Sequence, residues 1–287
     1  MILKGNLMDN YSHEIINDDT RLQLFFLPVT VDSSYSPLHW HGHLEIVLMR
    51  KGYMTAYVNE QKYTLKKDDM LVVNPKELHS TKTWGSAGYL LLQIPYDYLS
   101  RVLNHVSLIQ FQEFFPSITM NATQHRLLDC LLELSDTYEK KEDGYLLHFS
   151  SVVYEFLYIL YRNHSHRISR QAREKANYNF ERIEEVLHYV KSNYKKDISL
   201  NEAAGLLNVS PEYFCRLFKK HTGQTFLEYL NAVRLLHFYQ DLLDTDYSIN
   251  DLMTRNGITN YKVFMRTFKD TYGITPGRMR AQMNKAD

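Results

Sequence analysis

The chain has 287 residues, which is long enough for two domains with hydrophobic cores of their own. Hydrophobic residues make up 44% of it, so the chain is not intrinsically disordered. No apolar run approaches the roughly 18 residues of a membrane-spanning helix, so no membrane partner is expected.

Two further features predict a cytoplasmic protein. The N-terminal segment MILKGNLMDN lacks the charged and then apolar pattern of a secretory signal. The two cysteines, Cys130 and Cys215, lie far apart in the sequence and are expected to be free thiols.

Charge is unevenly distributed although the formal net charge is zero. Residues 1–161 carry 13 Lys+Arg against 19 Asp+Glu, whereas residues 162–287 carry 20 against 14. Such an asymmetry between the two halves indicates a nucleic-acid partner for the basic half.

Short β-branched and aromatic segments fill the first hundred residues, and turn signals separate them. Six segments are predicted to be strands: 21–31, 43–52, 54–59, 62–65, 69–74 and 89–94. Many short strands at close spacing predict a sandwich or a barrel.

Histidines gather around the second of these strands. His39, His41, His43 and Glu45 would alternate to one face of a strand, and His79 follows later in the sequence. Three of these residues with His79 could supply ligands for a divalent metal ion. Two alternatives remain open: a pocket for a small organic effector without metal, and histidines that only line the rim of a barrel.

Helical periodicity replaces the strand pattern after Pro95. Apolar residues at helical spacing predict helices at 96–104, 121–139 and 145–162. The last two helices can pack on each other and on the barrel, and part of their apolar faces can also form a dimer.

Residues 162–177 are polar, with five basic residues and one acidic residue. This composition predicts a linker. The chain beyond it is predicted to be all-helical, with an amphipathic helix at 179–193 and a long bridging helix at 224–243.

A repeat near the C-terminus is the most informative feature. Residues 198–218 and 247–268 each combine a short helix, a tight turn and a second helix. Six residues recur fifty positions later: Phe214, Arg216, Phe218, Lys219, Gly223 and Thr225 correspond to Phe264, Arg266, Phe268, Lys269, Gly273 and Thr275. The repeat predicts two helix-turn-helix units, each of which places its second helix in the DNA major groove.

The first unit carries clear start signals. Ser199 and Glu202 fit a capping box, Asn208 suits the tight turn, and Ser210 with Pro211 begins the second helix. The inward face of that helix is predicted to carry Tyr213, Phe214, Leu217 and Phe218. The outward face is predicted to contact DNA through Glu212, Cys215, Arg216, Lys219 and Lys220.

The second unit follows the same plan. Ser248 and Asp251 form its first cap, Gly257 lies at the turn, and Thr259 is predicted to cap the second helix. The predicted inward residues are Val263, Phe264, Thr267 and Phe268. The predicted DNA-contacting residues are Tyr261, Lys262, Met265, Arg266 and Lys269. Arginine reads guanine through paired hydrogen bonds, and lysine also binds phosphate.

Residues 180–280 resemble the DNA-binding domain of AraC/XylS-family transcription regulators. The likeness is carried by FCRLFKKHTGQTF at 214–226, FMRTFKDTYGITP at 264–276 and Arg234 between them. It implies two helix-turn-helix units joined by a long helix. By the resemblance, base-reading positions fall at Glu212, Cys215 and Arg216 in the first unit, and at Tyr261, Lys262, Met265 and Arg266 in the second.

Two residues of the second unit depart from the family pattern. Met253 stands where the family usually has alanine, and Asn256 stands where it usually has a β-branched apolar residue. Asn256 is expected to weaken packing there, so the second unit is expected to be less sequence-specific than the first.

The H-x-H-x₃-E spacing at His39, His41 and Glu45, the following Gly52 and the later His79 resemble a cupin barrel. In regulators of this family such a barrel is the usual N-terminal effector domain. The expected effector-binding residues are His39, His41, Glu45, His79 and Trp84, with an aromatic surface that could stack on a sugar ring. No metal or cofactor is assigned. The alternative is a metal-dependent cupin enzyme fused to a DNA-binding domain.

The expected fold is α+β and multidomain: a cupin-like β-barrel with two following helices, then an all-α domain with two helix-turn-helix units. The expected domains are 1–161 for effector binding and dimerisation, 162–177 as linker and 178–287 for DNA binding. The expected function is a transcription regulator, not an enzyme, that binds promoter DNA as a homodimer and responds to a small molecule. RNA polymerase is a candidate partner. Activation is the commoner role in the family, and an architectural DNA-binding protein without an effector is a third alternative.

Overall fold

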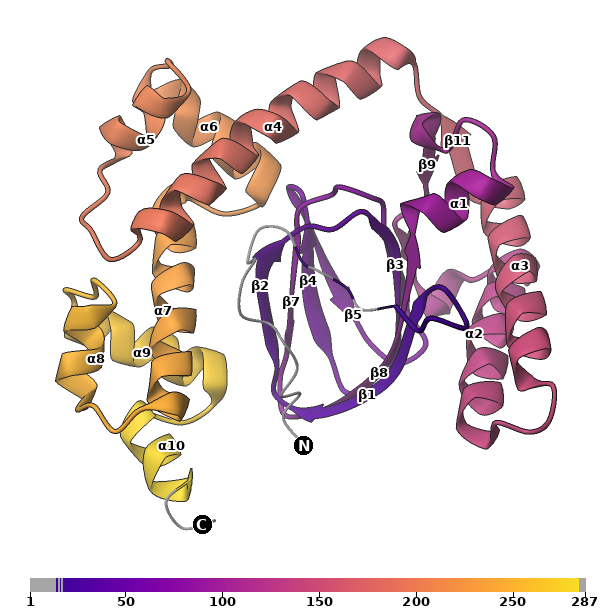
Figure 1. The fold of residues 1–287 in the computed structure, drawn as a ribbon, viewed down its shortest axis with the longest axis horizontal. Helices are drawn as coiled ribbons and strands as arrows, with labels where there is room; N and C mark the ends of the chain where they lie inside the picture. The colour runs from indigo at the N-terminus through magenta and orange to yellow at the C-terminus, as the bar shows by residue number, and fades with distance from the viewer. Residues whose placement is uncertain (1–13, 15, 17, 284–287) are drawn as a thin grey trace.

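Two antiparallel sheets form the barrel at the centre of the molecule (Figure 1). The computed structural model describes residues 14, 16 and 18–283 of the chain. Among these residues, one sheet has the strand order β1-β8-β3-β6-β10 and the other has the order β2-β7-β4-β5. The strands are β1 (Phe25–Asp32), β2 (Tyr35–His39), β3 (His43–Lys51), β4 (Met54–Val58), β5 (Gln61–Leu65), β6 (Met70–Val73), β7 (His79–Thr83), β8 (Ser86–Pro95) and β10 (Phe114–Phe115).

Strand β3 is buried on both faces. Leu44 and Ile46 pack in the cluster that also contains the helices after the barrel, whereas Val47 and Met49 pack in the barrel interior. Successive side chains of a strand point to opposite faces, so Glu45 shares the interior face with Val47. A carboxylate inside an otherwise apolar barrel needs polar partners.

The six predicted strands are confirmed, but β2 and β7 were missed. The sequence of β2 is YSPLH, with a proline and an irregular register between Ser36 and His39. The sequence of β7 is HSTKT, which has no large apolar residue. Neither segment has the run of large apolar and aromatic residues on which the other predictions rested. The two missed strands pair with each other, and His39 lies opposite His79.

Helices α2 (Ala122–Lys140) and α3 (Tyr145–Asn163) pack against the five-stranded sheet as a hairpin (Figure 1). The rings of Phe26 and Phe149 meet edge to face at 5.3 Å between their centroids. Both helices were predicted, as was the short helix α1 (Tyr96–Val102).

The segment predicted to be a linker is folded instead. Strand β11 (Ser165–Arg167) pairs with β9 (Ile109–Phe111), and helix α4 (Arg170–Asn193) begins directly afterwards. The Ser169 side chain caps this helix by accepting a hydrogen bond from the Ala172 amide at 3.1 Å. The polar stretch is rich in Arg, Gln, Ala, Glu and Lys, which are good helix formers, so its polarity indicated exposure and not disorder. Figure 1 shows α4 running from the α3 side of the molecule to the C-terminal helices.

The C-terminal helices form two small cores that share α7. The helices are α5 (Leu200–Leu206), α6 (Pro211–Thr222), α7 (Phe226–Asp244), α8 (Ile249–Arg255), α9 (Tyr261–Tyr272) and α10 (Pro276–Met283). Tyr229 and Val233 of α7 pack in the first core, whereas Phe238 and Leu242 pack in the second. The predicted bridging helix is therefore confirmed. No helix in the described part of the chain is long and apolar enough to cross a membrane.

Candidate functional site

Helix α6 of the first unit presents a polar face to solvent. Ser210 caps it by accepting a hydrogen bond from the Tyr213 amide at 3.3 Å, and the preceding turn uses Asn208 with a φ of 52°. All five residues predicted to contact DNA from this helix are exposed: Glu212, Cys215, Arg216, Lys219 and Lys220.

The capping box predicted before α5 is only half formed. Ser199 Oγ accepts a hydrogen bond from the Glu202 amide at 3.1 Å. The Glu202 carboxylate instead accepts a hydrogen bond from the Tyr189 hydroxyl on α4. The start of α5 is thereby joined to α4.

Helix α9 of the second unit begins one residue later than predicted. Its N-cap is Asn260, not Thr259, because the Asn260 side chain accepts a hydrogen bond from the Val263 amide at 3.1 Å. Gly257 has a φ of 66°, and a Cβ there would lie 2.5 Å from the carbonyl oxygen of Lys195, so this turn requires glycine.

Four of the five residues predicted to contact DNA from α9 are exposed: Tyr261, Lys262, Arg266 and Lys269. Met265 differs from them, since it is half-buried and packs against the core of the second unit. Its side chain is therefore partly committed to the protein interior.

Two residues that were predicted to face inward face outward. Tyr213 is 42% exposed and Val263 is 41% exposed. They occupy the same position in the two repeats, three residues before Arg216 and Arg266 respectively. Residues three apart lie side by side on a helix, so this spacing could have placed both with the arginines. Tyr213 and Val263 were predicted to lie in the core because their side chains are largely apolar.

Asn256 is fully buried, and its side-chain nitrogen has two polar partners. Its Nδ2 donates to Asp241 Oδ2 of α7 at 2.8 Å and to the Leu252 carbonyl at 2.9 Å. The hydrogen bond to the Asp241 carboxylate joins the end of α8 to the bridging helix, whereas Asn256 Oδ1 is buried without a hydrogen-bond partner among the described residues.

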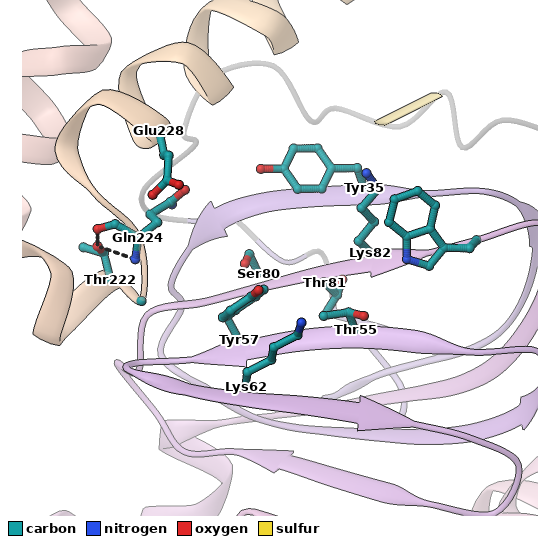
Figure 2. A pocket seen from close by; sticks show the side chains of 12 residues that line it. Tyr35, Thr55, Tyr57, Lys62, Ser80, Thr81, Lys82, Thr222, Gln224 and Glu228 are labelled. Atoms are coloured by element: carbon teal, nitrogen blue, oxygen red, sulfur yellow. Dashed lines mark hydrogen bonds between the residues drawn. The ribbon is translucent and has the colours of Figure 1, made fainter. Parts of the chain in front are cut away.

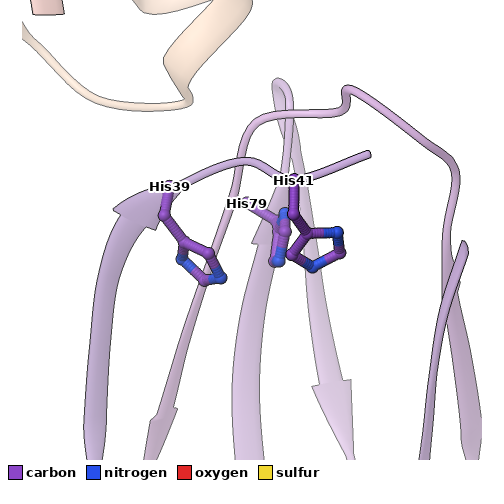
Figure 3. Close-up of side chains that lie close together, drawn as sticks. All are labelled: His39, His41 and His79. Carbon is purple, nitrogen blue, oxygen red and sulfur yellow. The ribbon is translucent and has the colours of Figure 1, made fainter. Parts of the chain in front are cut away.

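A buried polar cluster lies at the end of the barrel nearest the C-terminal helices. His39 ends β2, His41 lies in the loop before β3, and His79 begins β7. Figure 3 shows the three imidazole rings close together at this end of the barrel. One ring nitrogen from each lies within 4.8 Å of the others. The sequence prediction that these histidines alternate along one strand is wrong, because the chain turns between His39 and His43.

Glu45 supplies the carboxylate of this cluster. Its Oε2 lies 3.0 Å from His41 Nε2 and accepts a hydrogen bond from Gln93 Nε2 at 2.7 Å. Its Oε1 lies 3.7 Å from His79 Nε2. Glu14, from the segment before the barrel, adds a second carboxylate 3.5 Å from His39 Nε2.

The pKa values in this cluster are shifted by burial and by mutual charge. Burial opposes ionisation of Glu45, but His79 and His41 hold the pKa of its carboxyl well below the usual range. Burial also lowers the pKa of His39, yet the nearby Glu14 and Glu45 raise it above the ordinary value overall. Burial, together with the charge of His39, holds the pKa of His79 well below its ordinary value.

Two residues expected to belong with this cluster lie elsewhere. His43 turns away and places its Nε2 3.3 Å from Asp18 Oδ1. Trp84 is exposed in the turn after β7, where its ring lies under the Lys82 ammonium group at 3.8 Å. Trp84 therefore cannot share a pocket with the buried histidines.

Trp84 instead lines a separate cavity of about 400 Å³ on the outer face of the four-stranded sheet (Figure 2). Tyr57 and Lys62 line it from the barrel, Gln224 lines it from the turn before α7, and Glu228 lines it from the first turn of α7. This cavity therefore lies between the barrel and the first helix-turn-helix unit.

Residues beside the histidine cluster pack into the core of the first unit. Leu38 and Leu78 are buried in the same hydrophobic cluster as Val186 of α4 and Tyr229 of α7. The ring of Trp40 meets that of Phe180 on α4 edge to face at 4.9 Å between centroids. The residues on both sides of His39, and the residue before His79, thus contact the helical C-terminal half.

Sequence comparisons agree with this division of the chain. The model for the AraC-like ligand binding domain matches residues 30–157, and a helix-turn-helix domain model matches residues 203–282. The uncharacterized HTH-type transcriptional regulator YdeC of Bacillus subtilis is 22% identical over 255 residues, which cover 85% of this chain and 86% of that protein.

Other relatives share part of their length with this chain. Regulatory protein PocR of Salmonella typhimurium is 30% identical over 104 residues, or 36% of this chain and 34% of PocR. The uncharacterized HTH-type transcriptional regulator SAR0107 of Staphylococcus aureus is 23% identical over 83% of this chain and 31% of that protein. The chain therefore spans about a third of these two relatives.

Solved structures of regulators are also similar. Fatty-acid-bound ToxT of Vibrio cholerae is 13% identical, covers 93% of this chain and 97% of ToxT, and superposes with a TM-score of 0.42. The DNA-binding domain of AdpA in complex with a target DNA is 23% identical, covers 36% of this chain and 94% of that domain, and gives a TM-score of 0.34.

A ligand-binding barrel joined to a helix-turn-helix domain defines a transcription regulator that both senses and binds DNA. The two family matches together cover most of the chain, and the relatives are themselves transcriptional regulators. The protein belongs to the AraC family of transcription regulators.

Proposed function

We propose that this regulator transmits the state of its barrel to DNA through the position of the first helix-turn-helix unit. The observation that carries the proposal is the packing of Leu38, Trp40 and Leu78 into the core of that unit. A ligand that displaces the β2–β3 loop or the start of β7 would disturb this core directly.

A second set of contacts joins the barrel to the ends of both recognition helices. Gly223 ends α6 so close to the β4–β5 turn that a Cβ would lie 2.6 Å from the Asn59 carbonyl oxygen. Lys82 Nζ donates to the Asp270 carbonyl near the end of α9 at 2.7 Å. The barrel thus contacts both units while leaving their outward faces exposed.

The effect of a ligand follows from its preference between two arrangements. In one arrangement the barrel packs on the first helix-turn-helix unit, and in the other it does not. A ligand that binds both arrangements equally well leaves their populations unchanged, whereas a ligand that binds one of them more tightly increases the population of that arrangement. Coupling between two such sites usually changes affinity by about 5- to 150-fold.

On DNA, the two units are proposed to enter successive major-groove segments. Helix α7 is 19 residues long, or about 28 Å at 1.5 Å per residue, which is close to the roughly 34 Å of one turn of DNA. The contacting residues are those of the two predicted recognition faces, and Tyr213 and Val263 are added to them because they are exposed beside Arg216 and Arg266. Each protomer is expected to protect about two turns of promoter DNA.

Dimerisation is proposed to use the α2–α3 hairpin. Leu147, Tyr154 and Tyr158 leave large apolar side chains exposed on α3, and Tyr158 is 66% exposed. Sedimentation of the full chain should give a dimer, and Tyr158→Glu should shift it towards monomer. A monomeric wild type at tens of micromolar would exclude this part of the proposal.

The barrel is proposed to be a sensor and not a catalyst, because the relatives are regulators. Activation, with a contact to RNA polymerase, is the proposed outcome at the promoter. Transcription in vitro from a promoter with the footprinted site would distinguish activation from repression.

The coupling is tested by comparing the chain's two tryptophans. Trp40→Ala removes the contact with Phe180, whereas Trp84→Ala alters an exposed ring that lines the cavity beside the first unit but takes no part in the hydrophobic core shared with it. We expect Trp40→Ala to change affinity for specific DNA by about fivefold or more. Trp84→Ala should leave that affinity within about twofold of wild type. Equal affinities for wild type and a folded Trp40→Ala variant would contradict the coupling.

A further inference from the structure

We propose that Arg234 is a positioning residue for DNA recognition. It holds the loop between α4 and α5, residues 194–199, against α7 at the place where this loop meets the second unit. The two units are thereby joined rigidly, and the joint sets the spacing between the two DNA segments that they bind. The inference rests on the proposed entry of α6 and α9 into successive major-groove segments.

Arg234 ties the end of α4 to the bridging helix at two points. Its Nε donates to the Tyr194 carbonyl at 2.8 Å, and its Nη2 donates to the Lys196 carbonyl at 2.7 Å. The last carbonyls of a helix have no partner within it, and Tyr194 directly follows the last residue of α4. The planar fork of arginine suits two acceptors at once, whereas the ammonium group of lysine is a single point charge.

Burial of the guanidinium makes these two hydrogen bonds costly to lose. Arg234 is 8% exposed. Its removal from water lowers the pKa of Arg234, although the nearby Asp197 opposes this shift. A buried charge is stable only where polar partners replace water. The two carbonyls are such partners, so the guanidinium is expected to stay ordered between α7 and the loop.

Two further residues of α7 extend this contact along the helix. The ring of His237 stacks on that of Tyr194, with 4.1 Å between centroids and 3° between planes. Asp241 accepts a hydrogen bond from Asn256 Nδ2 at 2.8 Å. Arg234, His237 and Asp241 are spaced by three and then four residues, so they lie along one face of the helix. This face therefore contacts the loop at one end and the second unit at the other.

The loop also contacts the second unit directly. A Cβ on Gly257 would lie 2.5 Å from the Lys195 carbonyl oxygen and 3.0 Å from the Lys195 Cα, so the two backbones leave no room for a side chain. Lys195 lies between the two residues whose carbonyls Arg234 holds. In Figure 1 this loop lies beside α7, between α5 and α8. Arg234 therefore fixes the loop where it meets the α8–α9 turn.

A rigid joint of this kind predicts a strict spacing of the DNA site. One additional base pair between the two segments rotates one segment relative to the other by about 35° and moves it by about 3.4 Å. While the loop is held, the second recognition helix cannot follow this displacement, and its base contacts are lost. Once the loop is released, the second unit can adjust to the displaced segment more easily.

The test uses the full chain and a duplex site that the wild-type protein selects from randomised DNA. Altered sites carry one base pair more or one base pair less between the two segments. The measured quantity is the ratio of the Kd for an altered site to the Kd for the selected site. A general loss of attraction to DNA cancels in this ratio, so the ratio reports how strictly the two units are spaced.

We expect the ratio to be about tenfold or more for wild type and about threefold or less for Arg234→Gln, since base contacts of one unit are at stake. Arg234→Lys should resemble Arg234→Gln, because it keeps the charge but not the fork. Gly257→Ala should lower the ratio from the other side of the contact, because its Cβ displaces Lys195. Asn231→Ala, at an exposed position of α7, is the matched control and should keep the wild-type ratio.

Equal binding of altered and selected sites by the wild-type chain would overturn the inference without reference to any variant, provided that base changes in both segments weaken binding. A wild-type ratio in folded Arg234→Gln or Arg234→Lys would overturn it too, and Gly257→Ala decides the matter if urea denaturation shows that the Arg234 variants are unfolded. If base changes in the second segment leave wild-type affinity unchanged, the proposed binding to two segments is itself contradicted, and the inference falls with it.

Discussion

The two helix-turn-helix units repeat the same sequence pattern but differ in what covers their cores. The core of the first unit includes Leu38 and Leu78 from the barrel, together with residues of α4. The core of the second unit, among the described residues, is built from the bridging helix and the helices after it. The barrel meets the second unit through the hydrogen bond from Lys82 to the Asp270 carbonyl near the surface.

This difference indicates how the barrel can control both helix-turn-helix units although it packs closely on the first unit alone. A structural change at the end of the barrel nearest the C-terminal helices is transmitted to the first unit by direct packing. It is transmitted to the second unit mainly through α7. Helix α7 takes part in both cores, so the second unit is expected to follow the first as a body.

The largest expected effect comes from matched core truncations. Phe218 and Phe268 occupy equivalent repeat positions, and both are fully buried. Each alanine substitution should cost about 3–5 kcal/mol of unfolding free energy in its own unit. Phe218→Ala should also alter Trp40 fluorescence, because it loosens the core that reaches the barrel, whereas Phe268→Ala should leave that fluorescence unchanged. Identical fluorescence changes in the two variants would remove the distinction between the units.

The next effect concerns the buried Asn256. Asn256→Ala leaves Asp241 without its buried partner, so it should destabilise the second unit by about 1.5–3 kcal/mol. Urea denaturation of the variant measures the loss. Asn250→Ala, at an exposed position of the same helix, is the control and should stay near wild type. A neutral Asn256→Ala would show that the hydrogen bond adds no net stability.

Arg216 and Arg266 provide the comparison on DNA. Arg216→Ala should lose about 1–3 kcal/mol of discrimination between specific and random DNA, because a paired arginine–base contact is worth that much. Arg266→Ala should lose less, since the second unit is expected to tolerate base changes better. Competition binding with substituted sites measures both losses. Equal loss on specific and random DNA would make Arg216 a phosphate contact, and a larger loss for Arg266 would reverse the predicted ranking.

Lys82→Ala should have the smallest effect. The substitution removes one partly exposed hydrogen bond to the second unit, so its effect on specific DNA affinity should stay below about 1 kcal/mol. The same binding assay tests this, with Lys62→Ala as a control from the same outer face. A loss as large as that of Trp40→Ala would mean that the barrel controls both units equally.

The sequence was sufficient to predict the duplicated unit and four residues of the polar cluster, His39, His41, Glu45 and His79, but it wrongly added Trp84 and missed Glu14. Both predictions rest on spacing in the sequence. The helix-turn-helix pattern recurs after fifty residues, and histidines precede Glu45 at every second position. The exposed arginines of α6 and α9 followed from helical periodicity.

The remaining features depend on tertiary contacts. Leu38, Trp40 and Leu78 are apolar residues of a barrel, and nothing local distinguishes those that fill the barrel from those that pack on another domain. Strand β2 was missed because of its proline and irregular register, and strand β7 because it has no large apolar residue, although the two strands carry His39 and His79. The start of α4 was taken for a linker because its polar composition was given more weight than its helix propensity.

Hydrogen exchange of the full chain, compared between wild type and Trp40→Ala, tests whether the barrel acts through the first helix-turn-helix unit. We expect Trp40→Ala to exchange faster than wild type in the first-unit segments 183–190 and 226–233, and at an unchanged rate in the second-unit segment 261–272. Unchanged protection of the first unit, or an equal loss of protection in both units, would contradict the claim that the barrel acts through the first unit.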